Sequence, residues 1–329
     1  MIQMITDVII NVNTKTMHYK IQKMPQADWP PLLAEINDPP EQLYFAGQIP
    51  DYSRKLLCVV GSRKYTNYGR EAVEYLIREL SGYPITIVSG LALGIDSIAH
   101  RAALKNNLPT IAIPGSGLHP NALHPQTHVM LAQEIVDQGG TLISEMEPEQ
   151  KASLLMHDTA SKKVFFSFPK RNRIMAGMCH AILVVEAELK SGTLITSKLA
   201  TEYNREVLTI PGSIFSPHSD GPHMLLRLGA TPIRNADDIL EVLNIGKLDF
   251  GSSQKNSKNK AGKKESAYEN CSEKEMLIIK ILIEPLPRDE ILREANLQHQ
   301  IPIGETQTLL SLLELKGLIK ETLGEIRLI

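Results

Sequence analysis

Short apolar runs alternate with helix-length amphipathic stretches along most of the chain. The apolar runs are rich in valine and isoleucine, and they predict strands at residues 56–60, 85–88, 110–113, 142–144, 181–185, 206–210 and, more briefly, 231–233. Helical periodicity predicts helices between them at residues 69–80, 96–104, 127–137, 172–178, 193–203 and 221–228. Strands that are apolar throughout are buried on both faces, as in a parallel sheet. The alternation therefore predicts an α/β fold with a doubly wound, mostly parallel sheet.

The pattern changes at both ends of this α/β region, which covers residues 29–248. Residues 1–28 show no clear periodicity, and we expect an N-terminal arm or loose strand there. Residues 249–270 are polar and contain five lysines. They offer too little apolar surface to offset the entropy that ordering would cost. We therefore expect a flexible Lys-rich linker, with a strap that contacts phosphates as the alternative.

Residues 271–329 predict a second, smaller domain. Helical segments at residues 273–283, 287–295 and 304–316 precede a short hairpin. Three helices and a hairpin form the winged-helix plan, in which many domains place the third helix in the DNA major groove. Here that helix contains Glu305 and Glu314 but only one basic residue, Lys316. Because phosphate contacts need basic side chains, we favour contact with protein or dimerisation over reading of duplex DNA.

Composition limits the classes of function that fit the chain. Among 329 residues, 35 are basic and 37 are acidic, so the protein is no polycation and anion binding must depend on local placement. Cys58, Cys179 and Cys271 lie far apart in the sequence. This spacing argues against a disulfide framework or a clustered zinc site and fits a reducing cytoplasm. We expect no membrane-spanning segment and no export signal.

Turns rich in glycine and serine follow the predicted strands. Ligands of open α/β sheets bind beyond the carboxyl ends of the strands. There, glycine lets backbone N–H groups approach an anion, and a helix N-terminus adds positive potential. The alternative for each turn is that glycine only makes a tight connection. The candidate phosphate-binding residues of these turns are Gly61, Ser62, Ser89, Gly90, Gly115, Gly212 and Ser213.

Known cofactor patterns are missing from these turns. The chain has neither GxGxxG after a predicted strand nor GxxxxGK[ST], so we expect neither a dinucleotide nor a P-loop nucleotide as cofactor. His119, His124 and His128 are spaced by five and four residues, which does not match a helical metal-binding pair. We therefore expect packing and polar contacts in a loop, and no bound metal.

Residues 161–173, SKKVFFSFPKRNR, combine basic and aromatic side chains without an acid. Basic groups follow a phosphate backbone and aromatic rings stack on bases, which is what sequence-tolerant binding of single strands needs. We expect Phe168, in a turn before a proline, to expose its ring. We expect Lys170, Arg171 and Arg173 to contact phosphates, the arginines bidentately. The alternative is a buried Val-Phe-Phe strand followed by a solvated basic turn.

Several of these segments together resemble the DNA-processing protein A family (DprA, also called Smf). The resemblance covers about residues 29–240, and the GSR, SGLAxGIDxxAH and FPxRNRIxAG motifs are specific in combination. The segments that carry it, in order, are WPPLL at residues 29–33, GSR at 61–63, SGLALGIDSIAH at 89–100, FPKRNRIMAG at 168–177, VEA at 185–187, SGTLIT at 191–196 and IPGS at 210–213.

The resemblance implies an extended Rossmann-like domain that binds single-stranded DNA without catalysis and without a cofactor. Members of the family protect incoming single strands during natural transformation and load the RecA recombinase onto them, usually as homodimers. The winged-helix tail is also a family feature. The residues that the resemblance assigns to the DNA pocket are Arg63, Phe168, Arg171, Arg173 and Lys190, with Asn172, Ser191, Gly192 and Thr193 completing the wall.

Two other functions stay open. A nucleotide-binding sensor or nucleoside-phosphate hydrolase of Rossmann-like type would use an acid such as Glu186, close to the turn at residues 191–193. No partner base is specified, and Asp96, Glu145 and Glu186 are each more often helix caps or ion-pair members. A regulator would instead read duplex DNA through the winged helix. The basic, aromatic segment favours single-strand binding without an active site over both alternatives.

The sequence departs from the family pattern in three places. Little precedes Trp29, where the family has a helical domain. Residues 117–125, GLHPNALHP, replace the family's GLDxxYP and lack its acid and its tyrosine. The stretch over residues 145–168 is longer than usual. We expect these departures to change the rim of the pocket and the partner surface more than the central function.

Overall fold

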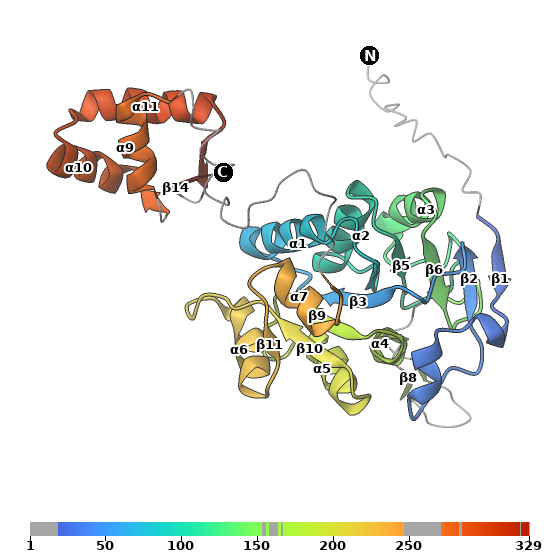
Figure 1. Ribbon diagram of the computed structural model, residues 1–329. Coiled ribbons are helices and arrows are strands. Elements are labelled where there is room, and N and C mark those ends of the chain that lie inside the picture. The colour runs from blue at the N-terminus through green and yellow to red at the C-terminus, as the bar shows by residue number, and fades with distance from the viewer. Residues whose placement is uncertain are drawn as a thin grey trace, which may run out of the picture. The chain divides into compact units, whose positions relative to one another are not determined.

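The computed structural model of the chain describes residues 19–152, 156–157, 164–165, 167–246, 271–282, 285–322 and 324–328. The chain divides into two compact units, residues 1–248 and 249–329. The first unit contains a large sheet with helices, and the second contains three helices and a small sheet (Figure 1).

Nine strands of the described residues form one sheet in the first unit. β1 and β2 are antiparallel to their neighbours, and the seven strands from β6 to the far edge pair in parallel. A doubly wound sheet with antiparallel strands at one edge is common, and it confirms the predicted fold class. The order from edge to edge is β1 (Ile21–Lys23), β2 (Tyr44–Gly47), β6 (Thr141–Ser144), β5 (Thr110–Ala112), β4 (Ile85–Ser89), β3 (Lys55–Val60), β9 (Ala181–Val184), β10 (Glu206–Thr209) and β11 (Thr231–Pro232).

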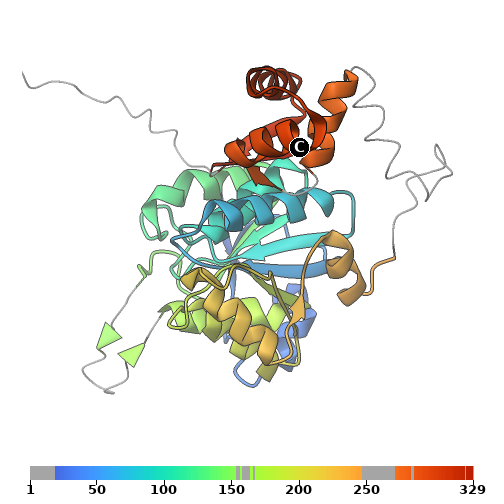
Figure 2. The same cartoon turned by 90° about the vertical axis from the view of Figure 1, so that its left-hand side faces the viewer.

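Helices cover both faces of this sheet, as Figure 1 and Figure 2 show. Successive side chains of a strand point to opposite faces. In β3, Leu57 and Val59 therefore pack with one helix layer, while Leu56, Cys58 and Val60 pack with the other. The first layer consists of α1 (Asn67–Glu79), α2 (Ile95–Lys105), α3 (Val129–Asp137) and α7 (Ala236–Val242), and the second of α4 (Ser167–Met178), α5 (Thr193–Glu202) and α6 (Asp220–Arg227).

The strand order reverses between β3 and β9. From β3 the chain proceeds through β4, β5 and β6 toward one edge, and from β9 it proceeds through β10 and β11 toward the other. The loops that follow β3 and β9 therefore diverge. Ligands of doubly wound sheets bind at such a switch point, outside the carboxyl ends of the strands.

The predicted helices and strands of this region are present, with ends that differ by a few residues. The largest difference concerns α4, which begins at Ser167 rather than at residue 172. Pro169 is compatible with this start, because the first turn of a helix does not use its N–H groups for intrahelical bonds. Phe168 therefore lies in the first turn of a helix, and the prediction of a turn conformation there is wrong. The sequence pattern does not predict β2 or α7.

Several predicted segments fall partly or wholly outside the described residues. The predicted N-terminal arm is described only from residue 19, and Ile21–Lys23 pair with β2 as an edge strand. The predicted linker at residues 249–270 is not described. In the basic, aromatic segment, β8 (Val164–Phe165) pairs antiparallel with β7 (Met156–His157), and residues 161–163 and 166 are outside the description.

The second unit contains α9 (Glu273–Ile281), α10 (Arg288–His299) and α11 (Ile303–Leu315). A three-stranded antiparallel sheet has the order β12 (Leu286–Pro287), β14 (Glu325–Leu328) and β13 (Ile319–Thr322). These elements include the three predicted helices, and the winged-helix assignment stays a prediction. Over the described parts of both units, no helix has the length and apolar character that crossing a membrane requires.

Candidate nucleic-acid interface

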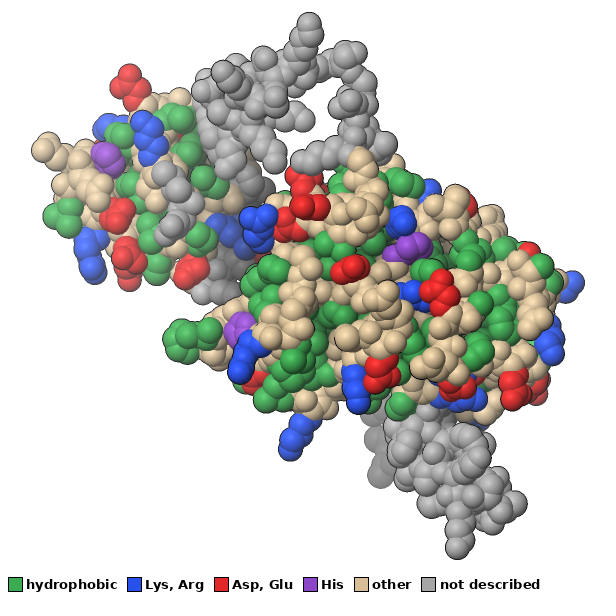
Figure 3. Space-filling model, turned by 60° about the horizontal axis from the view of Figure 1, so that its bottom comes forward, with side chains coloured by type: hydrophobic (Ala, Val, Ile, Leu, Met, Phe, Trp, Pro, Cys, Tyr) green, Lys and Arg blue, Asp and Glu red, His purple; other side chains and the backbone are tan. Residues whose placement is uncertain are grey.

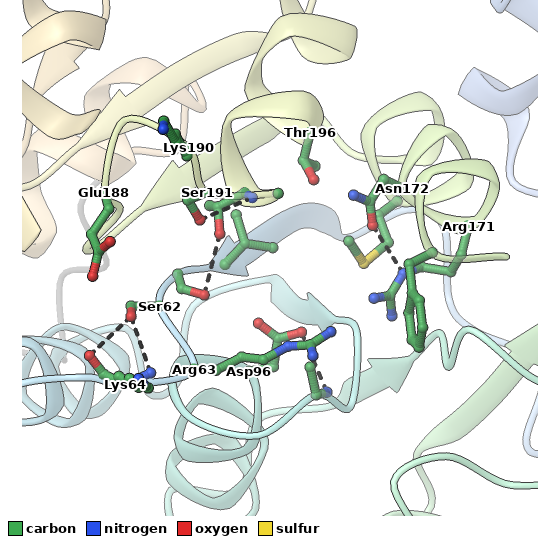
Figure 4. A pocket seen from close by; sticks show the side chains of 17 residues that line it. Ser62, Arg63, Lys64, Asp96, Arg171, Asn172, Glu188, Lys190, Ser191 and Thr196 are labelled. Carbon is green, nitrogen blue, oxygen red and sulfur yellow. Dashed lines mark hydrogen bonds between the residues drawn. The ribbon is translucent and has the colours of Figure 1, made fainter. Parts of the chain in front are cut away.

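A hollow of about 420 Å³ lies at the switch point, where the carboxyl ends of β3 and β9 meet the start of α4 (Figure 4). Its walls come mainly from the loop after β3, the loop after β9 and the first turns of α4, and Ala92 and Asp96 between β4 and α2 also line it. The fold thus brings together three motifs that are far apart in the sequence. Eight of the residues predicted to bind DNA line this hollow: Arg63, Phe168, Arg171, Asn172, Lys190, Ser191, Gly192 and Thr193.

Arg63 and Phe168 lie in direct contact at this hollow. The guanidinium carbon of Arg63 is 5.5 Å from the centroid of the Phe168 ring, within the range of cation–π attraction. Arg63 is exposed and Phe168 is half-buried. Figure 4 shows Arg63 extending across the hollow toward Arg171. The pair can offer a base an aromatic face and a planar cation, with positive charge within reach of the adjoining phosphate.

Two neighbours fix the position of the Phe168 ring. Gly115, in the turn after β5, leaves room for the ring, because a Cβ atom there would lie 2.6 Å from its Cδ1 atom. His124 meets the ring edge-on, with 5.6 Å between the ring centroids. Burial and the charge of Arg63 lower the pKa of His124, which favours its neutral form. Gly115 therefore makes room for an aromatic ring and does not itself line the hollow, and phosphate binding by Gly115 stays a prediction.

The loop after β9 supplies the opposite wall. Thr193 Oγ1 donates a hydrogen bond to Gly61 O at 3.2 Å, which ties this loop to the loop after β3. Thr193 N donates to Ser191 Oγ at 3.2 Å, and Thr193 is the first residue of α5. The N-terminus of α5 therefore brings positive potential to the hollow. Gly192 has open space where a Cβ would stand, and Lys190 is exposed, so this wall is accessible to a phosphate.

Arg171 lines the hollow but is itself buried. Its Nη1 donates to Gly90 O at 2.5 Å and to Ile113 O, and its Nε donates to Asn172 Oδ1 at 3.0 Å. Burial lowers the pKa of Arg171, and the charge of Asp96 opposes this shift. Contrary to the expectation of a guanidinium that reaches out to phosphates, Arg171 holds together the turns that follow β4 and β5.

A carboxylate of the protein occupies the anion position at the turn after β4. Asp96 Oδ2 accepts hydrogen bonds from Gly90 N at 3.1 Å and from Ala92 N at 3.4 Å. Burial raises the pKa of Asp96, while the charge of Arg171 and the two N–H groups lower it. Ser89 is fully buried, and its hydroxyl donates to a β3 carbonyl at 2.7 Å. The prediction that Ser89 and Gly90 cradle a phosphate is therefore wrong.

The turn after β10 lies outside the hollow. Gly212 packs closely against Ser219, and Ser213 Oγ accepts a hydrogen bond from Phe215 N at 3.2 Å. Neither Gly212 nor Ser213 lines the hollow. Of the seven predicted phosphate-binding residues, only Gly61 and Ser62 line it.

Arg173 and Lys170 line a separate, polar hollow of about 220 Å³. Arg173 is buried and donates to Asp38 O at 2.6 Å and to Glu145 Oε2 at 2.5 Å. Lys170 Nζ lies 3.5 Å from the same Glu145 oxygen. Burial raises the pKa of Glu145, and the charges of Arg173 and Lys170 oppose the shift. The structure therefore does not bring Arg173 or Lys170 together with Arg63 and Phe168.

Some residues of the switch-point hollow are not predicted from the sequence. Lys64 and Glu188 line it, as do Met175 and Thr196. Lys64 directly follows the GSR motif, and this position in the chain is the signal that could have identified it. Among the residues that line the hollow, four are basic and two are acidic. Figure 3 shows basic and acidic side chains interspersed on one face of the molecule, so the positive character of the hollow is local.

The candidate general base Glu186 has a structural role. Thr66 N donates to its Oε2 at 2.9 Å and Thr66 Oγ1 to its Oε1 at 2.5 Å, which places a negative charge at the N-terminus of α1. Of the loop histidines, His128 contacts Leu91 O through Nδ1 at 2.8 Å. No group of three or more potential metal ligands exists among the residues with described positions.

Comparison with known proteins places this arrangement in a family. The family model described as DNA recombination-mediator protein A matches residues 20–244. Protein Smf of Escherichia coli is 39 % identical over 218 residues, which are 66 % of this chain and 55 % of that protein. The DNA processing protein DprA of Streptococcus pneumoniae is 38 % identical over 208 residues, which are 63 % of this chain and 68 % of that protein. This chain thus spans little more than half the length of the E. coli relative.

Two solved structures share the fold. The S. pneumoniae DNA processing protein A has a TM-score of 0.60 and 37 % identity, covering 68 % of this chain and 74 % of the other. The Helicobacter pylori DNA processing protein A, described by its single-stranded DNA binding mode, has a TM-score of 0.56 and 28 % identity, covering 69 % and 97 %. Sequence motifs, fold and family model agree, and the chain belongs to the DNA recombination-mediator protein A family, the DprA/Smf proteins.

Proposed function

We propose that this chain binds single-stranded DNA in the switch-point hollow and leaves it chemically unchanged. The observation that carries the proposal is the contact between the exposed cation of Arg63 and the ring of Phe168. Unpaired bases stack on such a platform, and the nearby Lys64, Lys190 and the N-terminus of α5 can neutralise their phosphates. The single-stranded DNA binding mode described for the H. pylori relative supports the same ligand.

The exposed cations of the hollow set the expected salt dependence. If Arg63, Lys64 and Lys190 each neutralise one phosphate, the slope of log affinity against log salt is about -2, from about 0.7 per contact for single strands. Arg171 and Arg173 do not contribute to this value, because both are buried and hydrogen-bonded within the protein.

A competition assay tests the proposal. A labelled oligonucleotide is challenged with unlabelled single-stranded and duplex DNA over a salt series, and fluorescence anisotropy reports binding. We expect the single strand to compete far better than the duplex, and Arg63→Ala to weaken binding to all sequences alike. Equal competition by duplex DNA, or an Arg63→Ala variant with unchanged affinity and salt slope, would contradict the proposal.

The finer role that we propose is protection of incoming single strands and loading of RecA, in the cytoplasm, by a homodimer. Membership of the recombination-mediator family supports this role. The expected result is faster RecA-dependent ATP hydrolysis on single strands that are already covered by a single-strand-binding protein. Sedimentation should give twice the mass of the chain. An unchanged rate of hydrolysis argues against loading, and a monomer argues against the dimer.

The proposal includes no catalysis and no cofactor. The carboxylates of Asp96 and Glu186 are both buried and both accept hydrogen bonds from backbone N–H groups, which leaves them poorly placed as general bases. Incubation with nucleoside monophosphates should release no free base. If the wild type releases free base and Glu186→Gln does not, the hydrolase alternative is favoured instead.

For the second unit we propose contact with protein rather than with duplex DNA. On α11, Glu305 pairs with Lys274 at 2.5 Å and Leu315 is exposed, and neither feature suits a phosphate backbone. Deletion of residues 271–329 should leave affinity for single-stranded DNA intact. Loss of that affinity would support a DNA-reading role for this unit.

A further inference from the structure

Exposed apolar side chains continue from the switch-point hollow along the carboxyl ends of β3, β9 and β10. We call them the aromatic strip. Large exposed apolar side chains that lie together usually mark an interaction surface. Phe215 is 90 % and Ile214 is 78 % exposed, and neither contributes to a core cluster. The strip consists of Tyr65, Tyr68, Leu189, Ile214 and Phe215.

The three loops that carry the strip are joined by hydrogen bonds. Tyr68, in the first turn of α1, donates its hydroxyl to Pro211 O in the loop after β10 at 2.6 Å. Ala187 N, after β9, donates to His218 O at 2.9 Å. The three parent strands are direct neighbours in the sheet. The three loops that carry the strip are therefore held next to one another at one end of the sheet.

The strip is continuous with the hollow. Lys64 and Lys190 line the hollow, and each is adjacent in the chain to a member of the strip, Tyr65 and Leu189. At this edge the two lysines each stand beside an apolar side chain, and one acid, Glu188, precedes Leu189. A nucleic-acid single strand needs this combination, because phosphates and bases alternate along it.

The tip of the loop after β10 is ordered in a way that presents Phe215 to solvent. Ser216 N donates to Ser213 O at 3.1 Å, and Phe215 N donates to Ser213 Oγ at 3.2 Å. Gly212 packs closely against the Ser219 hydroxyl, which a side chain at residue 212 would have to displace. In Figure 1 this loop extends from the sheet beside α6. These bonds order the backbone of the turn, so ordering of the loop itself costs little entropy when a base stacks on the exposed ring of Phe215.

We infer that the aromatic strip is a second stacking subsite for the same single strand, with Phe215 as its main platform. The inference rests on the proposed function, because the strand that occupies the strip is the one that we propose to bind in the hollow. The occupant to which we commit is the stretch of single-stranded DNA that leaves the hollow past Lys64 and Lys190. A second copy of this chain is the competing occupant, and the experiment separates the two.

The test compares Phe215→Ala with Met130→Ala, a matched removal of an exposed apolar side chain on α3. Both variants are measured with oligothymidylates of about 4 and about 12 nucleotides, since single-strand sites span roughly 4–16 nucleotides. We expect Phe215→Ala to weaken binding of the longer strand about fivefold or more, from about 1 kcal/mol or more per stacked base. The shorter strand, which fills only the hollow, should bind as before, and Met130→Ala should change neither affinity.

A second variant reports stacking directly. Phe215→Trp should keep the wild-type affinity for the longer strand, and fluorescence from the introduced indole should be quenched on binding. The wild-type protein, whose one tryptophan is Trp29, is the fluorescence control.

Three results would overturn the inference. In the first, Phe215→Ala binds the longer strand with unchanged affinity. In the second, Phe215→Ala weakens binding of both lengths equally. In the third, Phe215→Ala has a lower sedimentation mass than the wild type but binds DNA normally, which would assign the strip to self-association. If Arg63→Ala abolishes binding of both lengths while Phe215→Ala changes neither, only the strip is misassigned. If the wild-type protein binds neither length, the proposed function itself fails.

Discussion

Helix α4 supplies side chains to two hollows. A basic side chain is ion-paired within the protein in one of them and exposed in the other. Phe168 and Arg171 line the switch-point hollow, whereas Lys170 and Arg173 line the polar hollow. In the polar hollow, the Arg173 guanidinium is 2.5 Å from the buried Glu145 carboxylate. At the switch point, the exposed Arg63 lies over an aromatic ring, and no ion pair links it to a described carboxylate. Arg173 and Arg63, which belong to motifs far apart in the sequence, thus differ in role because Arg173 is ion-paired in the interior and Arg63 is exposed.

Removal of the internal partner should give the largest effect. In Glu145→Ala the buried Arg173 loses its buried carboxylate and keeps only the largely exposed one of Asp38, which lies 3.2 Å from its Nε. Breaking a buried pair completely costs about 3–5 kcal/mol, and the remaining ion pair limits the expected cost to about 3 kcal/mol. We expect the free energy of unfolding, measured by urea denaturation, to fall by that amount. Arg63→Ala is the control and should leave stability unchanged. If wild type and Glu145→Ala have the same free energy of unfolding, the ion pair between Arg173 and Glu145 does not stabilise the fold.

Removal of the aromatic platform should affect binding and spare the fold. Phe168→Ala takes away the ring on which we expect a base to stack, worth about 1–3 kcal/mol. Anisotropy with a single-stranded oligonucleotide should show a loss of about fivefold or more, with little change in salt slope because no charge is removed. If Phe168→Ala binds single-stranded DNA with the wild-type affinity, the Phe168 ring is not part of the binding site.

A glycine pair tests whether the position of the ring matters. A Cβ at Gly115 would lie 2.6 Å from Phe168 Cδ1, whereas at Gly246, which is exposed and outside the hollow, nothing lies within 4 Å. We expect Gly115→Ala to displace the ring and to weaken binding of single-stranded DNA by a few-fold, less than complete loss of stacking. Gly246→Ala should bind like the wild type. The same affinity for both variants would mean that the ring need not be held in place.

The smallest expected change concerns one lysine and appears in the salt slope. Lys190→Ala should reduce the magnitude of the slope by about 0.7, the value for one single-strand phosphate contact. Lys198→Ala is the matched control, because Lys198 is exposed on α5 and lies 3.8 Å from Glu202. An unchanged slope for Lys190→Ala would place Lys190 outside the path of the DNA.

The sequence predicts most of the fold because the apolar runs of the parallel strands are nearly continuous. β3 to β6, β9 and β10 lie where these runs predict them. β2 (YFAG) is too short and too mixed in composition to give such a run, and the sequence does not predict it. The start of α4 is missed because Pro169 signals a turn in isolation, although a proline fits the first turn of a helix.

The sequence alone predicts the α/β class, the family and eight of the residues that line the hollow, since motifs and apolar periodicity are properties of the chain. Which basic groups remain available to a ligand depends on the tertiary structure. Arg171 and Arg173 lie two residues apart in one basic motif, yet the fold buries both and satisfies them from Gly90, Asp38 and Glu145. Burial and partners come from segments distant in the chain, and for a charged group they decide whether it stabilises the fold or meets a ligand.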